Sequence, residues 1–142
     1  MKKVLVTVKG IQKNDQNEQG IIELVTEGKF LRKGDNYYIK YDESEISGMD
    51  GTTTTLKVSD DVITLIRFGS NQAKMIFKKD KRYQLDYITP YGKVLLGIKP
   101  YKLFVNMNEN GGELEIKYNL DLNKEIVSNN ELHLTVREVN NG

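Results

Sequence analysis

Cysteine and tryptophan are absent from this 142-residue chain, and histidine occurs once, at His133. Without cysteine there can be no disulfide bond, thiolate metal ligand, iron–sulfur cluster or cysteine nucleophile. A lone histidine does not predict a zinc or copper site, because such sites need several nitrogen or sulfur ligands. The sequence also lacks a glycine-rich phosphate loop, an EF-hand pattern and a nucleophile elbow. No cofactor, metal site or catalytic residue is therefore predicted.

Neither sign of charge is in excess, since 21 basic and 20 acidic residues leave a net charge of +1. A balanced charge does not steer a protein toward nucleic acid or membrane. The eight tyrosines do not predict a base-stacking surface without basic groups to hold phosphates. No segment approaches the roughly 20 apolar residues of a membrane-spanning helix, and the apolar stretch from Val4 is too short for a signal peptide. We expect a cytoplasmic protein that binds neither nucleic acid nor membrane.

The sequence does contain a repeated alternation of apolar and polar residues. Its clearest stretch has apolar side chains at every second position, namely Leu114, Ile116, Tyr118, Leu120 and Leu122. This period of two is typical of a strand with one wet face. Short turns rich in Gly, Asn and Asp separate ten such segments, near 2–11, 21–32, 37–45, 52–58, 62–68, 72–78, 81–89, 93–107, 113–122 and 132–136. A bend or bulge is expected at Gly28, and a bend, a bulge or a sheet edge where Gly97 and Pro100 interrupt the eighth strand.

Short connections between successive strands favour an antiparallel up-and-down meander over a sandwich with crossing loops. We predict an all-β chain that forms one β-barrel domain over residues 1–142, with about 8–10 strands. Closing the sheet would remove its exposed edges. The interior of such a barrel is either filled by side chains or able to hold one small ligand.

A meander also predicts which loops lie together. If every connection reverses the chain, the loops at 12–19, 46–51, 69–71, 90–92 and 123–130 share one mouth of the barrel. The turns at 33–35, 59–61, 79–80 and 108–112 share the other. Polar residues near the first mouth are candidates for ligand binding: Tyr41, Glu43, Glu45, Thr53, Arg67, Tyr87 and Thr89.

Glu43 and Arg67 are central to this prediction. Each follows apolar residues on its own strand face, so a charge-assisted pair near the mouth is expected. Three interpretations remain open: a structural salt bridge, a polar anchor for a ligand, and acid–base catalysis. For catalysis, Glu43 and Glu45 would lie about 6.6 Å apart along a strand, near the spacing of paired-carboxylate hydrolases.

Two other charged features predict surface roles. His133 alternates with Leu132 and Leu134 and should face outward beside Glu131. A basic cluster straddles the hairpin between the sixth and seventh strands, at the second mouth, and consists of Lys74, Lys78, Lys79, Lys81 and Arg82. Such lysines are typical of a solvated turn that prevents a sheet edge from pairing with another strand. The functional alternative is that they bind phosphate or an acidic partner.

Several segments together resemble the YwiB-like family of uncharacterised bacterial proteins, found largely in Firmicutes. They are 22–28, 41–45, 46–54, 66–69 and Thr89-Pro90-Tyr91-Gly92. The resemblance runs from Val4 to about Val136 and implies a cytoplasmic barrel like those of calycins and lipocalins, without a known activity. The family pattern falls on Glu43, Gly48, Thr53, Arg67, Gly69, Thr89, Pro90 and Gly92.

The sequence thus favours a non-enzymatic module that binds a small ligand through a polar anchor at one barrel mouth. The alternative is a structural or interaction protein without an internal ligand, which self-associates, for example as a homodimer. A hydrolase that uses paired carboxylates is the third hypothesis.

Overall fold

The computed structural model describes residues 1–70, 72–89 and 92–139, except for the side chains of residues 87–89. Ten antiparallel strands make up almost all of it, as predicted. They are β1 (Lys2–Asn14), β2 (Gln19–Lys33), β3 (Asn36–Asp42), β4 (Thr52–Val58), β5 (Val62–Gly69), β6 (Ala73–Lys78), β7 (Tyr83–Thr89), β8 (Gly92–Asn108), β9 (Gly111–Leu122) and β10 (Glu125–Glu138). One short 3₁₀ turn, η1 (Glu45–Ser47), follows β3. None of the described residues forms a helix of the length and apolar character that crossing a membrane requires.

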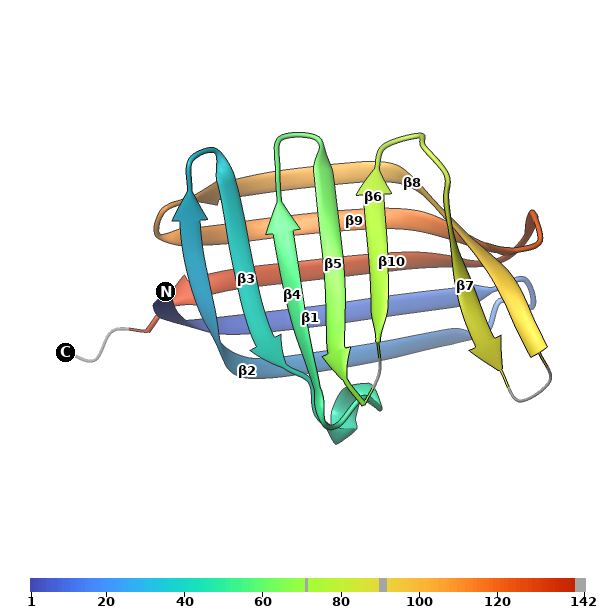
Figure 1. Cartoon of the computed structure of the whole chain (residues 1–142), viewed down its shortest axis with the longest axis horizontal. Coiled ribbons are helices and arrows are strands. Elements are labelled where there is room, and N and C mark those ends of the chain that lie inside the picture. Colours follow the sequence, from blue (N-terminus) through green and yellow to red (C-terminus); the bar gives the residue numbers. More distant parts are fainter. Residues whose placement is uncertain (71, 90–91, 140–142) are drawn as a thin grey trace.

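The strands form one sheet in the order β6-β5-β4-β3-β2-β1-β10-β9-β8-β7. Strands neighbouring in sequence are thus neighbours in the sheet, and β1 pairs with β10 to join the two halves. In Figure 1, β3 to β6 run across the layer formed by β1, β8, β9 and β10, and β2 bends from one layer into the other. The sheet therefore wraps around a single interior.

The barrel closes almost completely where β6 approaches β7 and β8. An isolated bridge joins Lys78 to Lys81, and the Asp80 N–H donates to the Pro100 carbonyl at 2.8 Å. Inside this seam the Phe77 ring packs edge-on against Tyr118 with centroids 5.1 Å apart. Side-chain packing and turn contacts, rather than a continuous ladder between β6 and β7, bring the two sheet ends together in the described residues.

Alternation along each strand sends apolar side chains to the interior. In β4, the side chains of Leu56 and Val58 are buried while Lys57 between them is exposed. The buried hydrophobic core draws on both layers: Val4, Val6, Leu24, Phe30, Ile39, Tyr41, Leu56, Val58, Ile63, Leu65, Phe77, Ile98, Leu114, Ile116, Leu134 and Val136. This burial is the main source of stability for a fold with no disulfide.

Irregularities of the sheet agree only in part with the predictions. The expected bulge at Pro100 is confirmed, because the register of β8 on β9 shifts between Pro100 and Lys102. Gly28 carries no bulge, since β2 keeps one register on β1 through that residue. The last strand begins at Glu125, so the predicted long loop 123–130 was wrong; a bulge between Ile126 and Ser128 disturbs its alternation instead.

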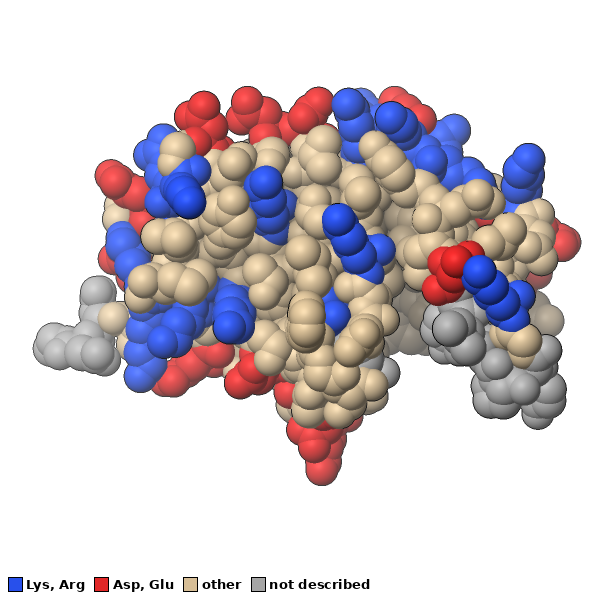
Figure 2. Space-filling view, in the orientation of Figure 1, with Lys and Arg blue, Asp and Glu red and all other residues tan. Residues whose placement is uncertain are grey.

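Charged side chains of both signs are spread over the outer surface (Figure 2). Basic side chains gather near the β6–β7 connection, which contains Lys79 and Lys81, and acidic ones lie at the tip of the η1 segment. Neither sign covers this face, as expected from the balanced composition.

Candidate functional site

A pocket of about 380 Å³ opens at the mouth where the β1–β2 loop and the η1 segment meet. Most of its lining is apolar, and the polar side chains come from β1, β3, β5, η1, β9 and β10, together with Glu43 just after β3. The lining residues are Val8, Gly10, Ile11, Gln12, Gly20, Ile21, Ile22, Tyr41, Glu43, Ser47, Met49, Leu65, Arg67, Tyr118, Asn130, Glu131 and Leu132. The topology argument thus correctly placed the 12–19 and 46–51 loops at one mouth.

Glu43 is the buried carboxylate of this pocket, with an exposed fraction of 7%. Its backbone N–H donates to the Thr52 carbonyl at 2.8 Å, which continues the β3–β4 pairing beyond the end of β3. The two side-chain oxygens accept hydrogen bonds from different hydroxyls, Oε1 from Thr54 and Oε2 from Ser47, each at 2.7 Å. Two hydroxyl donors therefore hold the carboxylate in one orientation.

The η1 turn positions one of these hydroxyls. The Ser44 side chain accepts from the Ile46 N–H at 3.2 Å and caps the turn. Gly48 ends it with φ of 74°, a left-handed conformation that glycine adopts at little cost. Together these caps bring Ser47 back over Glu43.

Arg67 enters the same pocket from β5, on the face of Ile63 and Leu65. No ion pair found among the described residues includes Arg67. Its Nε is buried and has no hydrogen-bond partner within the described part of the chain. The predicted salt bridge between Glu43 and Arg67 is therefore not formed, because hydroxyl groups hold the carboxylate instead.

Two tyrosines respond to the charges of the pocket. Burial raises the pKa of Tyr41, the Glu43 carboxylate raises it further, and Arg67 opposes the change. Burial also raises the pKa of Tyr118, again with Arg67 opposing. Both phenols are therefore neutral at physiological pH and can donate a hydrogen bond.

The structure separates the predicted site residues into three groups. Tyr41, Glu43 and Arg67 all line the pocket. Glu45 does not, because β3 ends at Asp42 and Glu45 is exposed in η1, so the two glutamates do not form a carboxylate pair on one strand face. Thr53 lies on the outer face, where its hydroxyl donates to Asp42 at 2.9 Å. The side chains of Tyr87 and Thr89 lie outside the described residues.

Sequence reasoning missed Thr54, Ser47 and Asn130 as polar groups around the pocket. For Thr54 a signal was available, because alternation places it on the same face of β4 as the buried Leu56 and Val58. Thr53 falls on the opposite face, with the exposed Lys57. For Asn130 a signal was also available, because it alternates with Leu132 and Leu134 on the inner face of β10, although the predicted loop 123–130 included it. The hydroxyl of Ser47, in contrast, depends on the local turn and could not be inferred from alternation.

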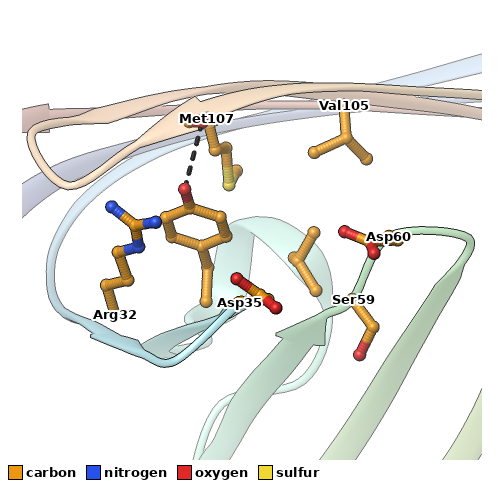
Figure 3. A pocket seen from close by; sticks show the side chains of 8 residues that line it. Arg32, Asp35, Ser59, Asp60, Val105 and Met107 are labelled. Carbon is orange, nitrogen blue, oxygen red and sulfur yellow. Dashed lines mark hydrogen bonds between the residues drawn. The ribbon is translucent and has the colours of Figure 1, made fainter.

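A second pocket, of about 320 Å³, lies at the opposite mouth beside the β2–β3 and β4–β5 turns. The Tyr37 hydroxyl crosses this opening and donates to the Met107 carbonyl at 3.3 Å, the dashed line in Figure 3. Its ring stacks on Phe30 with centroids 5.8 Å apart. Charged side chains at the rim, Arg32, Asp35 and Asp60, make this pocket polar. Tyr37 thus separates it from the apolar interior.

Two further clusters of charged side chains are held by ion pairs within the fold. Arg82, assigned to a solvated turn from sequence, makes a bidentate pair with Asp121 at 2.8 and 2.6 Å. Glu115, Glu131 and His133 bring potential metal-ligand atoms within 4.8 Å of one another. Lys117 Nζ lies 3.8 Å from Glu115 and 3.4 Å from Glu131, so these carboxylates already have a cationic partner.

The fold and the site define a class of protein: a small, nearly closed antiparallel β-barrel with an apolar pocket at one mouth and a few buried polar groups inside it. Its family follows from the sequence, because residues 6–134 match a domain of unknown function (DUF1934), and the chain belongs to that family. The ywiB protein from Bacillus subtilis has a similar crystal structure, with a TM-score of 0.82 and 20% sequence identity over 98% of this chain and 93% of that chain. This likeness confirms the fold and the resemblance noted from sequence. A comparison with curated proteins finds no match.

Proposed function

We propose that this protein binds a small, mainly apolar molecule in the pocket at the first mouth of the barrel. The supporting observation is a pocket of about 380 Å³ that combines apolar walls with the polar groups of Tyr41, Glu43 and Arg67. Small-molecule sites in proteins are typically concave, largely apolar and marked by a few placed polar groups. The opposite pocket lacks this combination, because its lining is mainly polar.

Acid–base catalysis has less support from the same residues. Both oxygens of Glu43 already accept hydrogen bonds from hydroxyl groups, and Glu45 lies outside the pocket. The separated carboxylates therefore do not provide the pair of groups that a glycoside-type hydrolysis requires.

Gly10 offers a direct test of binding. It lies on β1 between Val8 and Gln12, lines the pocket, and has open space around the position that a Cβ would take. A leucine side chain there fills part of the pocket without backbone strain. We expect the neutral fluorescent probe N-phenyl-1-naphthylamine to bind the wild type saturably, and Gly10→Leu to weaken binding by about tenfold or more, equivalent to about 1.4 kcal/mol.

Lys9→Leu is the matched control, because it places the same side chain on the outer face of β1, where the Lys9 Nζ lies 3.8 Å from the exposed Glu23 carboxylate. It should leave probe affinity unchanged, with circular dichroism showing that both variants fold. Equal probe binding by the wild type and folded Gly10→Leu would contradict the proposal.

A further inference from the structure

We propose that the ligand of this pocket carries a single negative charge, a carboxylate, which pairs with the Arg67 guanidinium while an apolar body occupies the walls. This inference rests on the proposed function and names the chemical class of its ligand. Among the described residues that line the pocket, Arg67 is the sole lysine or arginine. A charged group on the ligand would therefore be recognised at one defined place.

The first argument is the state of Arg67 itself. Its Nε is buried without a hydrogen-bond partner among the described residues, and no ion pair found there uses its guanidinium. A buried donor left without a partner costs free energy, whereas a carboxylate can accept two parallel hydrogen bonds from a guanidinium. An anionic ligand would supply the acceptor that the folded chain does not provide.

The second argument is that Glu43 does not take this role. Hydrogen bonds of 2.7 Å from Thr54 and Ser47 occupy its two oxygens. The structure thus holds one carboxylate with neutral hydroxyls and leaves the nearby guanidinium for another partner. Tyr41 and Tyr118, whose pKa values both respond to Arg67, offer neutral hydroxyls close to the same charge.

The third argument concerns the size of the ligand's charge. Glu43 lies in the pocket and repels an anion there. A phosphate monoester carries about −1.5 to −2 charge at neutral pH and would feel this repulsion more strongly than a carboxylate, with no second cation to offset it. Glu131 also lines the pocket, but its Oε1 lies 3.4 Å from Lys117 and is already paired. A monoanion therefore fits best.

The fourth argument concerns the uncharged part of the ligand. Val8, Leu65 and Leu132 line the pocket, and Ile21 and Ile22 continue the apolar surface to the mouth, where they are half-exposed. Contact with a ligand would remove these isoleucines from water. The ligand class is thus an amphipathic carboxylate with an aliphatic or aromatic body.

Isothermal titration calorimetry with decanoate, 1-decanol and decyl phosphate tests this inference. In the wild type we expect decanoate to bind at least about tenfold more tightly than either of the other two. Arg67→Gln should abolish the preference of decanoate over 1-decanol. Glu43→Gln should strengthen decanoate binding, because it removes a like charge and keeps a side chain that can still bond Thr54 and Ser47.

Binding of N-phenyl-1-naphthylamine shows whether each variant keeps an intact pocket. If the probe binds both wild type and Arg67→Gln, and decanoate shows no preference over 1-decanol in the wild type, the charge inference fails and the proposed binding function stands. If decyl phosphate binds most tightly, the carboxylate assignment is overturned. If neither the probe nor decanoate binds the folded wild type, both proposals fail.

Discussion

Arg82 and Asp121 show how single residues close this barrel. Asp121 lies on β9 with only 8% of its side chain exposed, and Arg82 reaches it from the segment just before β7. The pair passes over Gly97 of β8, where a Cβ would collide with both side chains. The backbone N–H of Lys124 also donates to Asp121, at 2.9 Å. One carboxylate thus ties together the β6–β7 connection, β8 and the β9–β10 turn.

The first prediction concerns the pH dependence of this pair. Hydrogen bonding by Arg82 is the main reason that the pKa of Asp121 is lowered in the folded chain. The stabilisation is therefore complete above the ordinary aspartate pKa of about 3.9, and is lost as pH falls through the lower folded value. Asp121→Asn should cost about 1–3 kcal/mol at pH 7 and less at low pH, measured by urea unfolding.

Asp61→Asn is the control for that experiment. Asp61 pairs with Lys78 at 3.7 Å on the surface, with 73% of its side chain exposed, so its loss should change stability by well under about 1 kcal/mol. Equal effects of the two substitutions at pH 7 would contradict the role assigned to Asp121.

A second prediction, at alkaline pH, concerns Tyr41. Its pKa is raised chiefly by burial, so the stability it contributes is present below the ordinary tyrosine value of about 10 and is lost as pH rises through the folded value. Tyr41→Phe should reduce the loss of stability above pH 10, followed by absorbance of ionised tyrosine and by urea unfolding. Tyr101→Phe, which removes an exposed hydroxyl, controls for the loss of one chromophore. An unchanged alkaline transition in Tyr41→Phe would refute this assignment.

At the level of residues, alternation predicted part of the site. It placed Arg67 on the inner face with Ile63 and Leu65, because β5 is regular. The prediction for Thr53 was wrong, although alternation with the exposed Lys57 places Thr53 on the outer face of β4. The prediction for Glu45 was wrong because the end of β3 depends on hydrogen bonds of the turn that follows. The hydroxyl of Ser47 lies in a turn, where side chains do not alternate between two faces, so the sequence pattern could not predict its position.

Among the elements, β2 is the strand that turns the sheet from one layer to the other. It pairs with β1 as far as Phe30 and with β3 from Gly28 onward, so both partners share the segment around Gly28. A Cβ at Gly28 would lie 2.7 Å from the Lys40 carbonyl oxygen and 2.8 Å from Val6 Cγ2. The predicted special role of Gly28 therefore comes from close packing at the bend rather than from a bulge.

The third prediction follows from this packing. Gly28→Ala should destabilise the protein by about 1–3 kcal/mol, since backbone and a core side chain would both have to move. Gly10→Ala, in an equally extended strand but with no atom within 4 Å of the new Cβ, should be neutral or slightly stabilising. Thermal or urea unfolding of the two variants measures the difference. Similar stability in both would show that the bend does not need a glycine.

For the whole molecule, the order of strands could be predicted because turns are short and each hairpin brings sequence neighbours together. The same rule correctly placed the 12–19 and 46–51 loops at one mouth. The crossing of the two layers could not be predicted, since it depends on bends within long strands such as β2 and β8 (Figure 1). The sequence also could not predict that Tyr37 crosses one of the two mouths, because the Tyr37 hydroxyl is held by the carbonyl of Met107, 70 residues away.

The central claim, that the pocket at the first mouth binds a ligand, is tested most directly by locating the bound ligand. Backbone and side-chain chemical shifts of isotope-labelled protein, titrated with decanoate, report on every part of the barrel at once. We predict saturable shifts at the pocket residues Val8, Ile22, Arg67 and Tyr118, and unchanged signals at Thr53 and Phe104, which lie away from its lining. Shifts confined to outer-surface residues, or no shifts with either decanoate or N-phenyl-1-naphthylamine, would contradict the claim that this mouth is a binding site.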